Sequence, residues 1–256
     1  MSSGYGASVW RRLPKPPPLE PGSVHVWRVQ LSDPERARAL RPLLSDDERA
    51  RADRFFREEH RIRFTVAHGQ VRRILAHYVN EPPPQLRFAE AEHGKPSLVS
   101  SAATADVHFN LSHSADLALV AVARAAPVGV DLEQWDDEVE HLALAERFFS
   151  EAERRALHDI AQTPGAVVGG FFAAWSRKEA YLKATGHGIT RGLHHFDVSL
   201  EPGDARLLAD RMDANAANAW AMSALDVAPN YSAAVVMARS TREVVLLDVE
   251  HALRGD

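Results

Sequence analysis

The chain has 256 residues, a length that suits one large domain or two of ordinary size. With 45% hydrophobic and 25% charged residues, its composition is that of a folded globular protein and excludes collagen-like, disordered and membrane classes. The absence of cysteine excludes disulfides, thiolate metal sites and a cysteine nucleophile. A net charge of −5 argues against general nucleic-acid binding, which needs a basic face. We expect a cytoplasmic protein, because residues 1–12 carry no apolar signal segment and no apolar run has the length of a membrane span.

The first half of the chain predicts one strand, a run of helices and then several strands. Residues 13–22 hold five prolines and read as an extended lead-in before the folded part. Helix starts are indicated by Asp33 before Pro34 and by the capping-box pair Ser45 and Glu48. A further helix is expected at residues 65–78. Strand-like apolar runs, separated by turn residues, lie at 24–31, 86–89, 107–111, 117–123 and 128–133.

The second half repeats this order of elements. Helical patterns lie at residues 139–149, 150–160 and 170–185, and Gly186 ends the last of them. Strand-like runs follow at 194–200, 220–225, 232–238 and 244–249. Because strand, helices and strands occur twice, we expect an α/β (α+β) chain with two similar halves that meet near residue 125.

Two carboxylates occupy the predicted strand at residues 128–133. The period of two along a strand places Asp131 and Glu133 on one face and the apolar Val130 and Leu132 on the other. Such a pair suits a hard divalent cation such as Mg²⁺, which takes one or two carboxylates together with phosphate oxygens. The alternative is an edge strand whose solvent face is acidic.

The predicted helix at residues 170–185 carries a stripe of functional side chains. Trp175, Glu179 and Lys183 recur every four residues, so they share one face of the helix. A surface ion pair explains Glu179 and Lys183 at this spacing. Phe171 and Phe172 make the helix largely apolar, however, and charges beside buried surface are retained where they have partners. The alternative to a surface pair is therefore a ligand site.

Five short motifs occur in a fixed order: Gly94-Lys95-Pro96, F-N-L-S-H-S at 109–114, G-V-D-L-E at 129–133, R-F-F-S-x-x-E at 147–153 and W-S-R-K-E-A-Y-L-K at 175–183. Together they resemble the 4′-phosphopantetheinyl transferase superfamily, specifically its long, monomeric Sfp type. The resemblance spans residues 23–240 and implies that family's fold. Two similar halves would be related by pseudo-two-fold symmetry, with the active site in the cleft between them.

The resemblance refines the expected organisation of the chain. It implies a Pro-rich extension at residues 1–22, an N-terminal half at 23–125 and a C-terminal half at 126–256. The first half would contact the phosphates of coenzyme A, and the second would hold the metal and the catalytic residues.

Members of this family move phosphopantetheine from coenzyme A to a serine of an apo acyl or peptidyl carrier protein and release adenosine 3′,5′-bisphosphate. The resemblance implies a transferase of this holo-carrier synthase kind, with coenzyme A as co-substrate and Mg²⁺, or Mn²⁺ in its place, as the metal. It implies a monomer with coenzyme A and the carrier as partners, and neither nucleic acid nor a membrane. Two alternatives stay open: a protein that binds coenzyme A or a carrier without catalysis, and an Mg²⁺-dependent phosphohydrolase.

The same resemblance assigns roles to individual residues. The metal ligands would be Asp131, Glu133 and Glu179. Glu179 would also be the general base, with a metal-bound water or Glu153 as the alternatives. Lys183 would neutralise or protonate the leaving phosphate. The coenzyme A phosphates would be held by Arg51, Lys95, Ser112, His113 and Lys183, with His113 at the 3′-phosphate.

Two positions have competing explanations. Glu48 stands where the family has a phosphate-binding cation, so the neighbouring Arg49 is the candidate substitute. Glu153 has a structural explanation in a capping box with Ser150. For the carrier, the candidate contacts are Phe148, Phe149 and residues 186–190.

Overall fold

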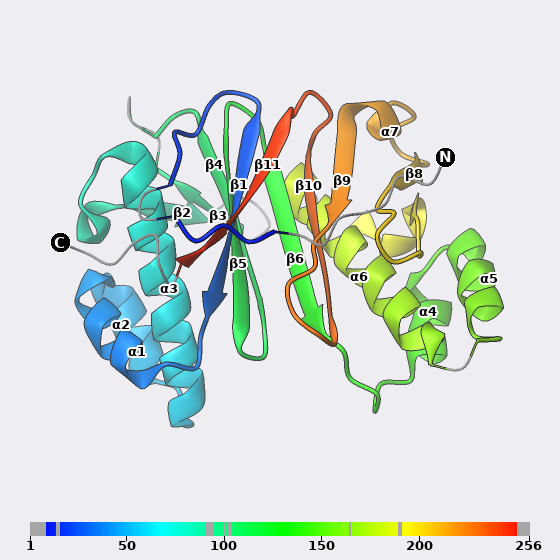
Figure 1. Ribbon diagram of the computed structural model, residues 1–256, viewed down its shortest axis with the longest axis horizontal. Helices are drawn as coiled ribbons and strands as arrows, with labels where there is room; N and C mark the ends of the chain where they lie inside the picture. The colour runs from blue at the N-terminus through cyan, green and yellow to red at the C-terminus, as the bar shows by residue number, and fades with distance from the viewer. Residues whose placement is uncertain are drawn as a thin grey trace. The chain divides into compact units, whose positions relative to one another are not determined.

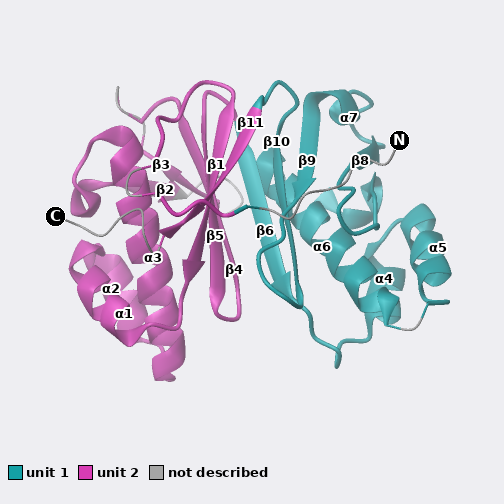
Figure 2. Cartoon of the chain, in the orientation of Figure 1, with its two compact units in different colours: residues 1–9, 127–242 teal, residues 10–126, 243–256 magenta. Residues whose placement is uncertain are grey.

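The computed structural model describes residues 9–13, 16–90, 95–99, 101, 104–163, 165–188 and 191–249 (Figure 1). This part of the chain divides into two compact units, coloured separately in Figure 2. Unit 1 contains residues 127–242. Unit 2 contains residues 10–126 together with 243–249. Gly94 of the first motif and residues 189 and 190 lie outside the described residues.

Unit 2 is built on a four-stranded sheet with the order β11-β1-β5-β4. The strands are β1 (Ser23–Gln30), β4 (Val107–Ser114), β5 (Leu117–Arg124) and β11 (Glu243–Asp248). β1 pairs parallel with β11 and antiparallel with β5, while β4 and β5 form an antiparallel hairpin. The central strand β5 is buried from Leu117 to Ala123, as its continuous apolar run requires.

Three α-helices lie in the described part of unit 2. They are α1 (Pro34–Leu40), α2 (Asp46–Asp53) and α3 (Glu58–Val79), and a short ribbon consists of β2 (Phe88–Glu90) and β3 (Pro96–Leu98). The side chain of Asp33 caps α1, and Ser45 and Glu48 form the expected capping box of α2. Val66, Ile74 and Leu75 of α3 are buried in the core of this unit together with Trp27 of β1.

Unit 1 has a three-stranded antiparallel sheet with the order β6-β10-β9. The strands are β6 (Val128–Gln134), β9 (Trp220–Ala224) and β10 (Tyr231–Ala238), and the long helix α6 (Ala166–Thr185) packs on β6 and β10. The remaining elements are α4 (His141–Phe148), α5 (Glu151–Ile160), α7 (Ala216–Ala219) and the ribbon of β7 (Phe196–Val198) and β8 (Leu207–Asp210).

Helix α6 approaches β6 closely at Gly129. A Cβ atom on Gly129 would lie 2.1 Å from the carbonyl oxygen of Ala180 and 2.4 Å from the backbone nitrogen of Ala184. Only glycine therefore allows this contact. Because side chains alternate along a strand, Asp131 and Glu133 lie on the face of β6 that is turned toward α6. The alternative of an acidic solvent face is wrong for Asp131, which is buried.

The α/β class expected from the sequence is confirmed, and two details differ from expectation. The segment at residues 244–249 was expected in the C-terminal half, but β11 pairs with β1 and belongs to unit 2. Leu19 of the Pro-rich lead-in is buried in the core of unit 2, and Arg11, which precedes the lead-in, forms a β-bridge with Leu247. Among the described residues, no helix has the length and apolar character needed to cross a membrane.

Candidate active site

Asp131 of β6 forms an ion pair with Lys183 of α6. The Nζ atom of Lys183 donates a hydrogen bond to Oδ1 of Asp131 at 2.6 Å. The side chain of Asp131 is 4% exposed, whereas that of Lys183 is 28% exposed. The pair therefore joins a buried carboxylate to a cation that still reaches the surface of unit 1.

Glu179 lies one turn before Lys183 on α6. Its Oε1 atom is buried and has no hydrogen-bond partner among the described residues. Burial raises the pKa of Glu179, as does the nearby charge of Asp131, while Lys183 lowers it. An unsatisfied buried carboxylate oxygen costs free energy in the isolated protein. This atom is therefore suited to a ligand that brings a positive charge or a proton.

The carboxylates of this region fit a hard cation in their chemistry, because Mg²⁺ prefers oxygen ligands. Glu133 shares the face of Asp131 and is partly exposed. Within the described ranges, however, no group of three or more Asp, Glu or His residues is arranged to hold a metal ion. The expected metal set of Asp131, Glu133 and Glu179 thus stays a prediction.

Glu153 has a fully structural environment. Its Oε1 atom is 2.8 Å from Nζ of Lys178 and accepts a hydrogen bond from the backbone N–H of Val198, also at 2.8 Å. Its Oε2 atom accepts the backbone N–H of Ser150 at 2.9 Å, which completes the expected capping box of α5. Both oxygens are engaged and the side chain is 2% exposed, so the structure favours the capping explanation of this residue.

Lys178, the partner of Glu153, was not singled out from the sequence. Its side chain has no exposed surface, and Nζ also donates to the carbonyl oxygens of Leu193 and Phe196 at 2.7 and 2.6 Å. Burial lowers the pKa of Lys178, while Glu153 raises it. Its burial could have been predicted because Lys178 and Glu179 are adjacent on an apolar helix. Successive residues of a helix point about 100° apart, so one of two adjacent charged side chains faces the buried side.

Four of the residues expected to bind coenzyme A phosphates, Arg51, Lys95, Ser112 and His113, lie in unit 2, whereas Lys183 lies in unit 1. Lys95 and His113 line different cavities. Ser112 is buried and His113 is exposed, because neighbouring residues of β4 point to opposite faces of the sheet. Lys95 lines a separate cavity with His108, and the burial of His108 and the charge of Lys95 lower the pKa of that imidazole. The guanidinium group of Arg51 lies 5.3 Å from the ring of Phe64.

His113 lines a cavity of about 180 Å³ that is rich in aromatic and basic side chains. Its neighbours there include His60, Arg63, Phe64 and His68 of α3. Arg63 donates to Asp116 at 2.9 Å, and Phe64 stacks on His68 with ring centroids 4.0 Å apart. The sequence reasoning missed this cluster. His60, Phe64 and His68 recur every fourth residue, and this spacing could have indicated that they share one helix face. This environment suits an anionic ligand.

Glu48 is part of the structure of α2 and α3. Its carboxylate accepts hydrogen bonds from Nε of Arg72 at 2.6 Å and from the backbone N–H of Ser45 at 2.8 Å. Burial raises its pKa, but hydrogen bonds from His68, Arg72 and Ser45 outweigh this and lower it to about 2. The candidate substitute Arg49 is also engaged, since it donates to Asp46 and to the carbonyl oxygen of Leu44.

Comparison with known proteins adds independent information. Residues 127–236 match the model of the 4′-phosphopantetheinyl transferase superfamily, and residues 27–125 match the model of the N-terminal part of 4′-phosphopantetheinyl transferase. The two matches meet next to the division between the units at residues 126 and 127.

Individual relatives extend over most of the chain. The chain is 40% identical to the 4′-phosphopantetheinyl transferase HetI of Nostoc sp. over 229 residues, which cover 88% of this chain and 93% of HetI. It is 29% identical to Sfp of Bacillus subtilis (strain 168) over 185 residues, covering 72% of this chain and 78% of Sfp. It is also 40% identical to psf-1 of Bacillus pumilus over 139 residues, or 52% and 56% of the two chains. With the site above and a relative of this identity along nearly its whole length, the chain belongs to the 4′-phosphopantetheinyl transferase superfamily.

Proposed function

We propose that this chain transfers 4′-phosphopantetheine from coenzyme A to a serine of an apo acyl or peptidyl carrier protein and releases adenosine 3′,5′-bisphosphate. The observation that carries the proposal is the unsatisfied Oε1 atom of Glu179 beside the ion pair of Asp131 and Lys183. The family membership of the chain and the transferase names of its relatives support it.

A divalent cation, Mg²⁺ or Mn²⁺, fits this donor set. Asp131 and Glu179 would hold it, and Glu133 is the next carboxylate on the same face of β6. When bound, the cation supplies positive charge that offsets the developing charge of a pyrophosphate. The electrostatic effect of Asp131 on Glu179 supports the assignment, because two neighbouring carboxylates in a partly buried place favour a bound cation.

The residues of unit 1 have distinct tasks in the proposed transfer. The serine oxygen of the carrier attacks the phosphorus that bears pantetheine, and the bond to adenosine 3′,5′-bisphosphate breaks. Glu179 takes the serine proton, and burial favours this role because it raises the pKa of the carboxyl group. The ammonium of Lys183, oriented by Asp131, neutralises the leaving phosphate oxygen.

For the nucleotide end of coenzyme A, we propose the cavity around His113. Arg63 and His113 would contact the 3′-phosphate, and the aromatic ring of Phe64 with Arg51 above it would border the site. Lys95 and Ser112 stay predictions of the family resemblance. A cleft between two symmetric halves is likewise a prediction of the family resemblance, and a crystal structure with bound coenzyme A would test it.

The carrier is proposed to dock on α4. Arg147 is exposed and lies 5.0 Å from the ring of Phe148, which is partly buried. An exposed cation beside an aromatic ring suits the acidic surface that carrier proteins typically present. The transferase is proposed to act as a monomer.

One experiment separates this function from its alternatives. The full chain is incubated with an apo carrier, coenzyme A and Mg²⁺, and the intact mass of the carrier is measured. Transfer predicts a gain of one phosphopantetheine per carrier and none on a carrier whose acceptor serine is replaced by alanine. An unchanged carrier with consumed coenzyme A would instead indicate a phosphohydrolase. An unchanged carrier with intact coenzyme A would indicate a binding protein.

A further inference from the structure

One face of α6 carries buried polar side chains at Arg177, Lys178 and Tyr181. Successive residues of a helix point about 100° apart, so these three side chains lie within an arc of about 100°. The same spacing places Glu179 and Lys183 on the opposite side of the helix axis. Because Lys183 bonds to Asp131 of β6, the buried polar face is turned away from the carboxylate site.

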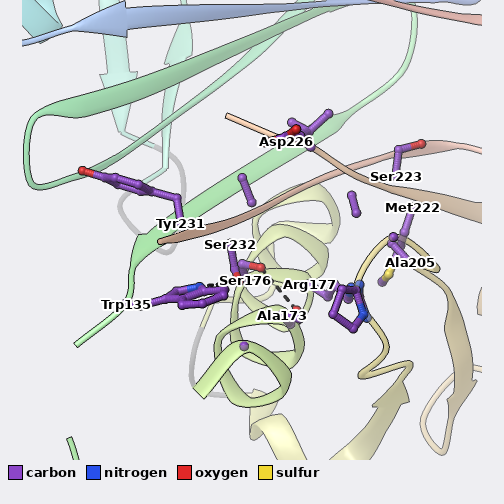
Figure 3. A pocket seen from close by; sticks show the side chains of 16 residues that line it. Trp135, Ala173, Ser176, Arg177, Ala205, Met222, Ser223, Asp226, Tyr231 and Ser232 are labelled. Atoms are coloured by element: carbon purple, nitrogen blue, oxygen red, sulfur yellow. Dashed lines mark hydrogen bonds between the residues drawn. The ribbon is translucent and has the colours of Figure 1, made fainter. Parts of the chain in front are cut away.

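These polar side chains all bond to one segment, residues 193–210, which contains the ribbon of β7 and β8. Arg177 donates from Nη1 to the carbonyl oxygen of Ser199 at 2.5 Å and from Nη2 to that of Glu201 at 2.7 Å. Figure 3 shows Arg177 in the wall of a cavity of about 510 Å³ that is also lined by Ala205 of this segment. Because the guanidinium group is planar and rigid, two bonds to two carbonyl groups restrain the direction of the side chain as well as its position.

The other two side chains extend this connection along α6. Nζ of Lys178 donates to the carbonyl oxygens of Leu193 and Phe196. The hydroxyl group of Tyr181 donates to Oδ2 of Asp210 at 2.7 Å. The helix is thus hydrogen-bonded to the first residue of β7 and to the last residue of β8.

The acceptor of the Tyr181 hydroxyl group belongs to a buried ion pair of Asp210 with Arg191. The side chain of Asp210 has no exposed surface, and its carboxylate also accepts hydrogen bonds from Arg191 and from the backbone N–H of Met212. Nε of Arg191 is buried and has no hydrogen-bond partner among the described residues. A buried ion pair contributes little net stability, because the removal of both charges from water offsets their attraction. The pair is therefore better explained as a fixed acceptor for Tyr181 than as a source of stability.

The contact of α6 with β6 has less directional character. Gly129 meets Ala180 and Ala184, residues that allow a close approach but whose side chains cannot form hydrogen bonds. Lys183 does bond to Asp131, but its side chain is 28% exposed and ends a flexible four-carbon stem. The polar bonds to residues 193–210 therefore supply a directional restraint on the rotation of α6 that the contact with β6 lacks.

We propose that Arg177 and Tyr181 are positioning residues of the transfer, an inference that rests on the proposed function. By bonding α6 to residues 193–210, they hold the helix at the rotation that turns Glu179 and Lys183 toward the carboxylate of β6. They act through these two side chains and do not take part in the chemistry themselves. A small misplacement of reacting groups lowers the rate of the chemical step even where substrates still bind. Loss of either positioning residue should therefore lower kcat more than it raises KM.

The first test removes one hydroxyl group from each unit. Tyr181→Phe deletes the donor to Asp210 and keeps the ring, which packs against Phe196 with ring centroids 4.9 Å apart. Tyr78→Phe is the matched control, because the hydroxyl group of Tyr78 in α3 accepts the indole N–H of Trp27 at 2.8 Å. Both variants should lose free energy of unfolding in urea. For Tyr181→Phe alone we expect a kcat about tenfold lower, with a KM for coenzyme A within about twofold of the wild type.

A second pair of variants tests the other positioning residue. Arg177→Lys keeps the positive charge but has one nitrogen in place of the two that reach Ser199 and Glu201. We expect its kcat to fall about fivefold with little change in the KM for coenzyme A. Arg155→Lys makes the same change at an exposed position of α5 and should have the kcat of the wild type.

The two pairs of variants together decide the inference. A wild-type kcat in folded Tyr181→Phe or folded Arg177→Lys would overturn it, because the bonds would then serve stability alone. An equal fall of kcat in Tyr78→Phe would overturn it as well, since any loss of stability would then have the same effect. In each of these cases the wild-type chain would still modify the carrier, whereas failure of the proposed function would leave the carrier unmodified by the wild type.

Discussion

Glu153 and Glu179 are both glutamates of helices in unit 1, yet their carboxylates have opposite environments. Both oxygens of Glu153 accept hydrogen bonds or contact Lys178, whereas Oε1 of Glu179 is buried without a partner among the described residues. A base must be able to gain a proton at a position that substrate can reach. The proposed role of general base therefore falls on Glu179.

Replacing Asp131 by asparagine tests the proposed carboxylate site. Asparagine keeps the shape of the side chain and an acceptor for Lys183 but removes the negative charge. We expect the rate of transfer to fall by about a hundredfold or more, with little change in melting temperature. Rates come from the intact mass of the carrier, and Glu138→Gln, at an exposed position, is the control. A folded Asp131→Asn enzyme with normal rate and Mg²⁺ dependence would contradict the assignment.

His113 tests the proposed nucleotide site. If its imidazole contacts the 3′-phosphate, the wild type prefers coenzyme A over 3′-dephospho-coenzyme A, and His113→Ala loses this preference because the discriminating contact is gone. The two donors are compared by their kcat/KM values. His158→Ala, at an exposed position of α5, provides the matched control. Retained discrimination in His113→Ala would place the 3′-phosphate elsewhere.

Among the elements, those defined by local chemistry were predictable. The capping boxes at Ser45 and Ser150 mark the starts of α2 and α5 as expected, because each depends on residues three positions apart. The partner of β11 was not predictable, since it pairs with β1 more than two hundred residues earlier. The short strands β3 and β8 were missed because three or four residues of mixed polarity give no clear period.

The packing of α5, α6 and β7 around Glu153 gives a prediction about stability. Glu153→Gln removes the charge that compensates Lys178 in the core. Breaking a buried pair in this way costs about 3–5 kcal/mol, so we expect a marked loss in the free energy of unfolding measured with urea. The pH dependence of kcat in the remaining folded enzyme should keep its wild-type shape. A stable Glu153→Gln variant whose pH profile of kcat has lost its acidic or basic side would instead indicate that Glu153 takes part in proton transfer.

The contact of α2 with α3 gives a prediction about acid stability. The pKa of Glu48 is lowered to about 2 in the folded protein, so its ionised form stabilises the fold. Relative to the usual glutamate pKa of 4.5, this lowering corresponds to about 3 kcal/mol of stability, fully present above about pH 5 and lost as the pH falls toward 2.

Urea unfolding between pH 7 and pH 3 measures this contribution. Glu48→Gln should be less stable at pH 7 and should lose less stability on acidification than the wild type. Asp47→Asn, at an exposed position of the same helix, should behave as the wild type. An acid dependence that is unchanged in Glu48→Gln would contradict the role of this carboxylate.

For the whole molecule, the motifs identified the residues of the candidate site but not their contacts. Asp131, Glu179 and Lys183 were all named from the sequence, and Gly129 explains why they meet, since its missing side chain lets α6 approach β6. The ion pair of Asp131 with Lys183 and the burial of Lys178 depend on how α6 is rotated about its axis. That rotation is determined by packing along the entire helix, which no short motif records.

The chain as a whole is acidic, but the carboxylates and the basic cavity of the candidate sites lie in different units. The carboxylates considered for a cation lie in unit 1, and the basic and aromatic cavity of His113 lies in unit 2. The net charge of −5 therefore says little about ligands, because screening over about 8 Å makes local groups decisive.

Glu179 is proposed to promote the transfer of phosphopantetheine to a carrier serine. The most direct measurement is the intact mass of an apo carrier after incubation with coenzyme A, Mg²⁺ and either the wild-type chain or Glu179→Gln. We predict one phosphopantetheine per carrier and equimolar adenosine 3′,5′-bisphosphate with the wild type, and an unmodified carrier with a folded Glu179→Gln variant. An unmodified carrier with the wild type, or full modification by Glu179→Gln, would contradict the account.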